Sequence, residues 1–195
     1  GSLKDFEILT NAPKCVAVGE IGLDYYYETS DKSTQIKVFD TFCDLGRRLN
    51  KPLIIHCRDK EDKNDAYKEI YDLLKNNYSG VKFVVHCYSG NLEYLDKFLS
   101  LGAYIGITGM ITFEKANNIR EISSMTPLSR IFLETDSPYL APKPYRGRTN
   151  HPKHLAIIAE ELAKVKKITI EELAYQTTQN ALIFYNIKAQ LSNKI

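Results

Sequence analysis

The chain has 195 residues, of which 44% are hydrophobic and 26% are charged, and its formal net charge is +2. This composition excludes a disordered chain, and no apolar run approaches the roughly 18 residues of a membrane span. The small net charge does not indicate nucleic acid, so such a partner has to be inferred from a site. We treat Gly1 and Ser2 as a cloning scar and expect residues 1–195 to form one domain.

The four cysteines show no CxxC spacing, and Cys57 and Cys87 fall in apolar runs, where a free thiol packs as a small hydrophobe. This usage indicates a reducing compartment without disulfides. We therefore expect a cytoplasmic protein, with the nucleus as the alternative, and no membrane partner.

Five short apolar runs recur along the chain, and each is nearly continuous rather than alternating. Strands that are buried on both faces of a parallel sheet have this pattern. The five predicted strands are Cys15–Glu20, Pro52–His56, Val81–His86, Ala103–Thr108 and Arg130–Asp136.

Segments with helical periodicity separate or follow these strands. Alternating strands and helices indicate an α/β fold with right-handed crossovers, and a (β/α) barrel is the fold class that we predict. The irregular segment after the last strand, Ser137–Asn150, lies where barrel enzymes carry working loops. The predicted helices are Ser33–Asn50, Asp62–Asn77, Asn91–Leu101, one that starts at Asn150 with Pro152 and carries an apolar stripe from Leu155 to Ala163, and one from Glu171 to about Tyr185 with Thr169 as a possible N-cap.

Four residues of metal-ligand type each end a different predicted strand: Glu20, His56, His86 and Asp136. The carboxyl ends of parallel barrel strands meet on one face, so we expect these side chains to converge. Imidazole and carboxylate suit zinc, manganese or iron, and carboxylate also suits magnesium. Glu20 is placed to bridge two cations, and Asp136 to bind a cation and activate water. Taken singly, each could instead be a rim histidine or a helix-capping acid.

Other polar residues leave two interpretations open. Arg58 lies two residues beyond His56 and so points to the same side, either to bind a phosphate oxygen or to form a surface salt bridge. Arg146, which we favour over Arg148, is either a phosphate clamp or a solvated loop arginine. We interpret His151 and His154 as surface or capping residues rather than ligands. The tyrosines that follow strand ends either stack on bases or pack over the barrel mouth; they are Tyr25, Tyr26, Tyr27, Tyr88 and Tyr139.

Several longer motifs, taken together, resemble those of the TatD-like deoxyribonucleases from about Val16 to Tyr185. The motifs begin with Gly19-Glu-Ile-Gly-Leu-Asp-Tyr-Tyr26 and Pro52-Leu-Ile-Ile-His-Cys-Arg58. They continue with His86-Cys-Tyr-Ser-Gly90, Tyr104-Ile-Gly-Ile-Thr-Gly109, Glu134-Thr-Asp-Ser-Pro-Tyr-Leu-Ala-Pro142, Arg146-Gly with Asn150-His-Pro152, and Thr177-Thr-Gln-Asn-Ala181.

The resemblance implies a metal-dependent hydrolase that cleaves DNA phosphodiester bonds on an amidohydrolase-type barrel. It implies that Glu20 is a bridging carboxylate, that His56 and His86 are metal ligands, and that Asp136 is a ligand that also activates water. It also places Arg58 and Arg146 near the substrate. The implied cofactors are divalent ions, Mg, Mn or Zn, with two in the intact protein.

This chain departs from the family pattern in one respect. The family carries a His-x-His pair on its first strand, and this chain has no such pair. The resemblance places Gly19–Gly22 on the fourth barrel strand, so we expect strands four to eight only, the C-terminal two-thirds of the barrel, with Leu3–Asn11 as the end of a preceding helix. An incomplete barrel has two open edges, through which we hypothesise self-association. Without the pair, we predict weak metal binding and little or no nuclease activity for this chain alone.

Two alternatives to a DNA hydrolase remain. The same scaffold could cleave lactones, amides or phosphotriesters, because fold and ligand set do not fix the substrate. The chain could also be a non-catalytic, metal-poor relative. Arg58 and Arg146 favour an anionic substrate.

Overall fold

The structure, a computed structural model that describes residues 2–27 and 29–188, contains one five-stranded parallel sheet with strand order β1-β2-β3-β4-β5. The strands are β1 Val18–Asp24, β2 Leu53–Arg58, β3 Phe83–Val85, β4 Tyr104–Ile107 and β5 Ile131–Leu133. Within the described residues the sheet is open, because the outer edges of β1 and β5 have no paired strand.

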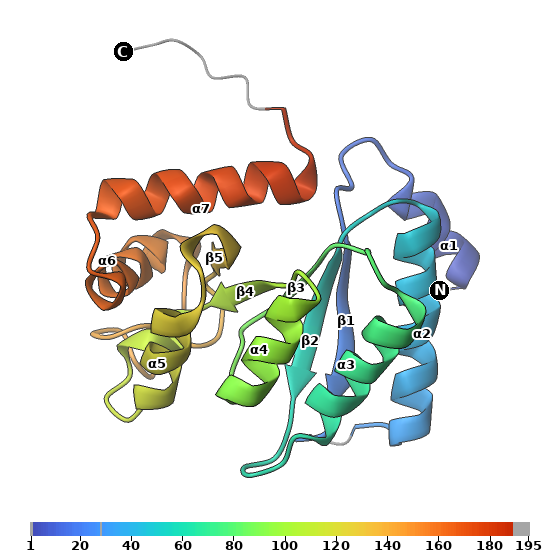
Figure 1. The fold of residues 1–195 in the computed structure, drawn as a ribbon, viewed down its shortest axis with the longest axis horizontal. Helices are drawn as coiled ribbons and strands as arrows, with labels where there is room; N and C mark the ends of the chain where they lie inside the picture. Colours follow the sequence, from blue (N-terminus) through green and yellow to red (C-terminus); the bar gives the residue numbers. More distant parts are fainter. Residues whose placement is uncertain (1, 28, 189–195) are drawn as a thin grey trace.

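Helices connect and flank the strands, and Figure 1 shows α3 and α4 in front of the sheet, α2 beside β1, and α7 across the top of the view. Our predicted helices are confirmed within a few residues, but α5 was missed. The helices are α1 Leu3–Thr10, α2 Lys32–Arg48, α3 Asp65–Asn77, α4 Leu92–Ser100, α5 Asn117–Met125, α6 Leu155–Lys166 and α7 Ile170–Tyr185, with 3-10 turns at Gly109–Thr112, Leu128–Arg130 and Pro152–His154.

The α7 helix begins where its sequence places an N-cap. The Thr169 hydroxyl accepts a hydrogen bond from the Glu172 amide, and Glu171 and Glu172 lie in the first turn, where the helix dipole favours negative charge. None of the described helices is both long and apolar enough to span a membrane.

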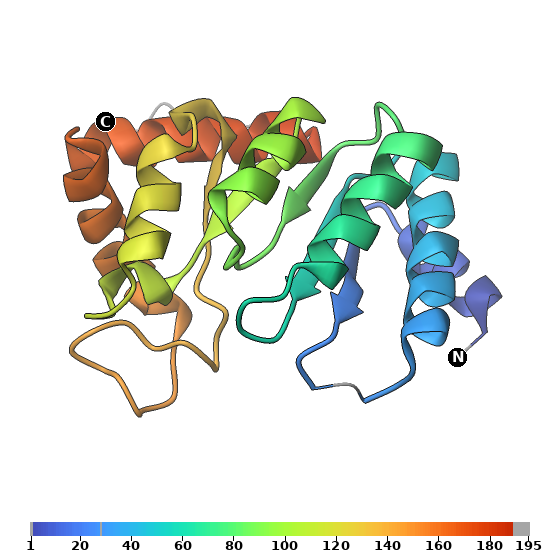
Figure 2. The same ribbon diagram turned by 60° about the horizontal axis from the view of Figure 1, so that its bottom comes forward.

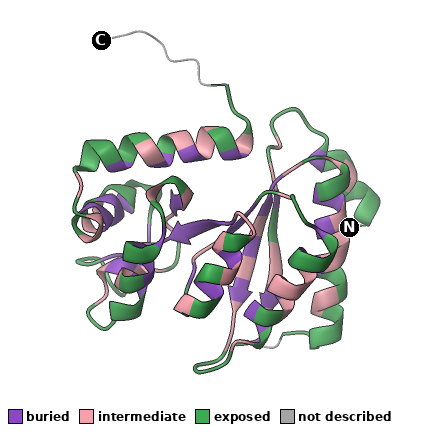
Figure 3. Cartoon of the chain, in the orientation of Figure 1, coloured by how far each residue is buried: buried purple, intermediate pink, exposed green. Residues whose placement is uncertain are grey.

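The larger core lies between the sheet and the helices α2 to α6. Its strand residues point alternately to this side and include Leu53, Ile55, Val85 and Ile105, all of which are fully buried. Figure 3 shows this burial as purple along the strands and inner helix faces, with green on the outer helix faces. All four cysteines lie in the described residues and are free thiols.

The opposite face of the sheet has two layers. Near the strand beginnings, Ile54, Val84, Tyr104 and Phe132 form an apolar layer against Phe184 of α7. The register joins the first three in one row, since Ile54 pairs with Val84 and Val84 pairs with Tyr104, while Phe132 pairs with Gly106, two residues further along β4. One step further along the strands, positions on this same face are polar, and these positions build the candidate site.

Candidate metal and phosphate site

The polar layer follows from the two-residue repeat of each strand. On β2, Ile54 is followed on the same face by His56 and Arg58, and on β1 Gly22 pairs with His56 and Asp24 with Arg58. His86 follows β3 directly, two residues after Val84, and Glu134 follows β5, two residues after Phe132. The loops after β1, β2 and β5 gather at this end of the molecule, which Figure 2 brings forward.

The prediction that Glu20 ends its strand is wrong, because β1 continues to Asp24 and Glu20 is its third residue. Gly22 permits this continuation. Its φ is 152°, and a Cβ atom at this position would lie 1.9 Å from the His56 carbonyl oxygen, so β1 and β2 approach too closely for a larger residue.

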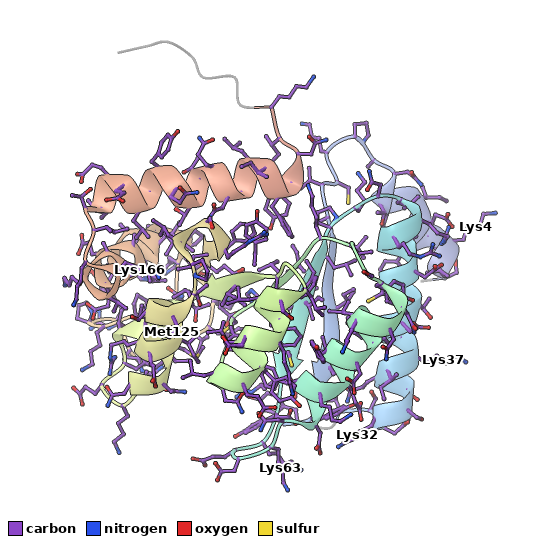
Figure 4. All side chains as sticks on the ribbon, in the orientation of Figure 1. Lys4, Lys32, Lys37, Lys63, Met125 and Lys166 are labelled. Carbon is purple, nitrogen blue, oxygen red and sulfur yellow. The ribbon has the colours of Figure 1, made fainter. Side chains whose placement is uncertain are left out.

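A pocket of about 960 Å³ opens at this end of the sheet, and all six predicted site residues line it: Glu20, His56, His86, Asp136, Arg58 and Arg146. They come from β1, β2 and the segments after β3 and β5, so the fold brings together residues spread over more than half of the sequence. In Figure 4 the labelled Lys63 marks this end, on the loop that follows β2.

His56 lies between two carboxylates. Its Nδ1 is 2.9 Å from Glu20 Oε1, and its Nε2 is 2.9 Å from Asp24 Oδ2. The hydrogen bond with Glu20 raises the pKa of His56, burial opposes the rise, and Asp24 adds to it. The same hydrogen bond lowers the pKa of Glu20 against the opposing effect of burial.

Asp24 also organises the turn after β1. Its Oδ1 accepts hydrogen bonds from the backbone amides of Tyr26 and Tyr27, at 3.0 Å each. Burial raises the pKa of Asp24, but these amides and His56 outweigh burial, so the pKa is lowered overall.

His86 is held in the same way by two other carboxylates. Its Nδ1 is 2.8 Å from Glu134 Oε2, and its Nε2 is 3.0 Å from Asp136 Oδ1. Burial lowers the pKa of His86, but the hydrogen bonds to Asp136 and Glu134 outweigh burial and raise the pKa to about 10. The Cys87 amide also donates to Glu134 Oε2, at 3.0 Å.

Gly106 on β4 makes the space for Glu134. A Cβ atom at this position would lie 2.1 Å from Glu134 Oε2 and 2.5 Å from its carboxyl carbon. The absence of a side chain in the middle of β4 therefore lets a carboxylate from the next strand enter the polar layer.

Asp24 and Glu134 are the site residues that our sequence reasoning missed. Both could have been found from strand periodicity, since Asp24 is four residues beyond Glu20 and Glu134 is two residues before Asp136. An even separation along extended chain places both members of such a pair on the same face.

The residue types of the site fit a divalent cation, since two imidazoles and several carboxylates are ligands that such ions take. Among residues 2–27 and 29–188, however, no three His, Cys, Asp or Glu side chains are arranged to hold an ion. Both ring nitrogens of His56 and of His86 contact carboxylates instead. The site thus contains side chains of the types that bind a cation, but in this structure the histidines and carboxylates contact one another.

The tyrosines divide between the two interpretations. Tyr25 and Tyr88 are buried packing residues, and the Tyr25 hydroxyl donates to Glu69. Tyr26, Tyr27 and Tyr139 line the pocket and are exposed, so only these three are accessible for stacking.

The sequence predicts His154 to be a surface or capping residue; it is not at the surface, but it does occupy the N-cap position of α6, without a capping hydrogen bond from its side chain. His154 is buried, its ring stacks on Tyr145 at 4.4 Å, and its Nδ1 lies 2.9 Å from Asn150 Oδ1. Asn150 in turn donates to the carbonyls of Thr135 and Tyr139. Neither His151 nor His154 lines the pocket; the buried Asn150–His154 pair fastens the loop that carries Asp136 and Arg146.

With this geometry established, the comparisons with known proteins identify the family. A family model described as TatD related DNase matches residues 1–186. The chain belongs to the TatD-related DNase family. The uncharacterized metal-dependent hydrolase YcfH of Escherichia coli is 38% identical over 187 residues, which are 96% of this chain and 69% of that protein.

Other TatD relatives agree with this assignment. A protein of Erwinia tasmaniensis named as the 3'-5' ssDNA/RNA exonuclease TatD is 34% identical over 185 residues, 92% of this chain and 69% of that protein. A TatD homologue from Escherichia coli superposes with a TM-score of 0.83 at 27% identity, covering 96% of this chain and 71% of that chain. A TatD family hydrolase from Entamoeba histolytica superposes with a TM-score of 0.82 at 28% identity, covering 95% of this chain and 68% of that chain.

The comparisons therefore confirm the predicted family and the predicted fold class. This chain, with its five parallel strands, corresponds to about 70% of the length of these TatD structures.

Proposed function

We propose that this chain hydrolyses phosphodiester bonds in nucleic acid, with DNA as the expected substrate and a divalent cation as cofactor. One observation carries the proposal: a single pocket unites two imidazoles and several carboxylates with three arginines, Arg58, Arg146 and Arg148. The imidazole and carboxylate groups suit a cation, and the arginines suit the phosphate oxygens of a substrate.

The residues proposed to hold the cation are Glu20, His56, His86 and Asp136, and the candidate ions are Mg, Mn and Zn, with two ions in the intact arrangement. A bound cation would polarise a phosphoryl oxygen and lower the pKa of water. Asp24 and Glu134 would orient the two imidazoles, because each contacts one ring nitrogen of its histidine. The other ring nitrogen then faces a proposed cation ligand, Glu20 for His56 and Asp136 for His86.

Asp136 is proposed to hold the attacking water and accept its proton. Its Oδ1 contacts His86 Nε2 at 3.0 Å, and its carboxylate lines the pocket between His86 and the loop that carries Arg146. A carboxylate in this position can act as a general base once a phosphodiester is bound against the arginines.

DNA and RNA must be compared, since the Erwinia tasmaniensis relative carries both in its name. The competing reaction is hydrolysis of a neutral ester or lactone on the same scaffold. Arg58 and Arg146 favour the anionic substrates, because a neutral ester would gain little from two guanidinium groups.

The test measures cleavage of labelled single-stranded DNA and RNA, and of a neutral nitrophenyl ester, with Mg²⁺, Mn²⁺, Zn²⁺ or EDTA. We expect slow, cation-dependent cleavage of nucleic acid, which Asp136→Asn lowers by at least roughly 100-fold. Asp96→Asn, an exposed change on α4 outside the pocket, is the matched control and should cleave at the wild-type rate. Cleavage that survives EDTA or Asp136→Asn, or cleavage of the ester alone, would contradict the proposal.

A further inference from the structure

Two of the three arginines that line the pocket, Arg58 and Arg146, lie against aromatic rings. The guanidinium carbon of Arg58 lies 4.3 Å from the ring centroid of Tyr26 and 4.8 Å from that of Tyr27. The guanidinium carbon of Arg146 lies 3.7 Å from the ring centroid of Phe113. Contacts of this length hold a planar guanidinium by its face.

Several other arginines use their side-chain N–H groups within the protein, although among the described residues Arg148, which also lines the pocket, does not. Arg47 and Arg48 form ion pairs with Asp44, and Arg120 donates to the backbone carbonyls of Ile111 and Phe113. Within the described part of the chain, by contrast, neither Arg58 nor Arg146 donates a hydrogen bond or forms an ion pair. Their N–H edges remain available to a ligand, while their faces are fixed.

The aromatic residues beside each arginine are fixed by hydrogen bonds to the surrounding structure. The backbone amides of Tyr26 and Tyr27 donate to the Asp24 carboxylate, which also contacts His56. The backbone at Phe113 is held by Arg120.

A further contact links this turn to the loop that carries Arg146. The Lys143 amide in that loop donates to Thr112 Oγ1, at 3.0 Å. The two stacks are therefore attached to opposite ends of the sheet order, one after β1 and β2 and the other after β4 and β5.

In this order His86, which follows β3, lies between Arg58 on β2 and the loop after β5 that carries Arg146, whereas Glu20 and Asp24 belong to the outer strand β1. A ligand that contacts both guanidinium groups has to extend across the pocket from Arg58 on β2 to Arg146 on the loop after β5. It also has to present an anion to each arginine. A single phosphate can meet one arginine edge, whereas a nucleic-acid strand presents successive phosphates.

We propose that Tyr26, Tyr27 and Phe113 are positioning residues that hold Arg58 and Arg146 as two separate phosphate receptors, so that the site selects an oligonucleotide with several phosphates over a dinucleotide with one. This proposal rests on the proposed function for the identity of the substrate. It adds the residues that set substrate length, and it requires no cation for binding.

The test is binding without turnover. Fluorescence anisotropy of a labelled single-stranded DNA dodecamer is measured with wild-type protein in EDTA, where unlabelled oligothymidylates of two and four nucleotides compete. We expect the four-nucleotide competitor to be at least roughly tenfold more effective, because it engages a second charge-assisted contact. Equal competition by the two lengths would overturn the two-receptor arrangement.

Paired variants test the stacks. Phe113→Leu, and the double change Tyr26→Leu with Tyr27→Leu, should each weaken dodecamer binding about fivefold or more and reduce its salt dependence. Phe113→Tyr and the double change to Phe keep the rings and should bind within about twofold of wild type. Wild-type affinity in the Leu variants would overturn the positioning role.

A further variant keeps the test valid if a Leu variant fails to fold. Arg146→Lys on the exposed loop keeps the charge but loses the planar edge, and it should weaken binding as much as Phe113→Leu does. If the dodecamer binds as expected but is never cleaved with any cation, the proposed function fails and this inference stands. If wild-type protein in EDTA does not bind the dodecamer, this inference fails whatever the cleavage assay shows.

Discussion

Replacing Glu134 by Gln removes one negative charge from the most buried ionic cluster of the site while keeping the shape of the side chain. Glu134 Oε2 lies 2.8 Å from His86 Nδ1 and accepts the Cys87 amide at 3.0 Å. The side-chain oxygen of Gln can still accept one of these hydrogen bonds. The variant therefore isolates the charge from the packing around Gly106.

The magnitude follows from the pKa of His86, which two carboxylates raise from 6.5 to about 10 against the effect of burial. With one carboxylate neutralised, we expect roughly half of this rise in pKa to be lost. The pKa of His86 would then be about 8. At pH 7 the lost interaction corresponds to about 2 to 3 kcal/mol of unfolding free energy, because one pKa unit is about 1.4 kcal/mol.

The sign of the pH dependence is fixed by linkage. A histidine whose folded pKa is raised contributes stability that is fully present below its unfolded pKa, near 6.5, and is lost as the pH rises through the folded pKa, near 10. The difference between wild type and Glu134→Gln should therefore be at nearly its full value at pH 7 and fall below about 1 kcal/mol at pH 10.

Two measurements on EDTA-treated protein check this prediction: guanidinium chloride unfolding at pH 7 and pH 10, and an NMR titration of the four histidine rings. Glu93→Gln is the control, since Glu93 is an exposed partner of Lys97 on α4 and should change stability by less than about 1 kcal/mol without moving the His86 titration. An unchanged His86 pKa in Glu134→Gln, or a stability loss that is the same at both pH values, would refute the reasoning.

Three further changes test other parts of the structure. Gly106→Ala should displace the Glu134 carboxylate, cost about 1 to 3 kcal/mol in chemical unfolding and lower the pKa of His86 in the same NMR titration; an unmoved titration would show that the carboxylate is not displaced. Thr169→Ala removes the N-cap of α7 and should cost about 1 kcal/mol, whereas no loss would mean that the hydroxyl does not cap. Ile105→Ala opens a cavity in the fully buried core and should lower the unfolding free energy by about 2 to 5 kcal/mol, in contrast to the small effect expected if this side of the sheet were exposed.

Much of the fold could be predicted because most of the strands are short apolar runs between amphipathic helices; β1, with the sequence Val-Gly-Glu-Ile-Gly-Leu-Asp, is the strand whose end was misplaced. The missed helix is α5, which has nine residues, no side-chain N-cap and only two buried isoleucines. A helix of this length carries too few periodic positions to separate it from the loops around it.

The site was predicted in outline but not in its pairing. Convergence of Glu20, His56, His86 and Asp136 follows from parallel strands, which bring their carboxyl ends to one face. That each imidazole lies between two carboxylates depends on side-chain orientation and on the space left by Gly106, neither of which the sequence pattern encodes. The burial of His154 likewise depends on a loop that folds back on Asn150.

The central claim is that His56 and His86, and not the other two histidines, are ligands of one cation site. Because the chain has only four histidines, their ring nitrogens can be followed individually by NMR while Zn²⁺ is added. The account predicts that the His56 and His86 signals shift on Zn²⁺ binding, that those of His151 and His154 stay in place, and that Asp136→Asn weakens the response. Zn²⁺ that leaves His56 and His86 unchanged, or that acts on His151 and His154 instead, would contradict the account.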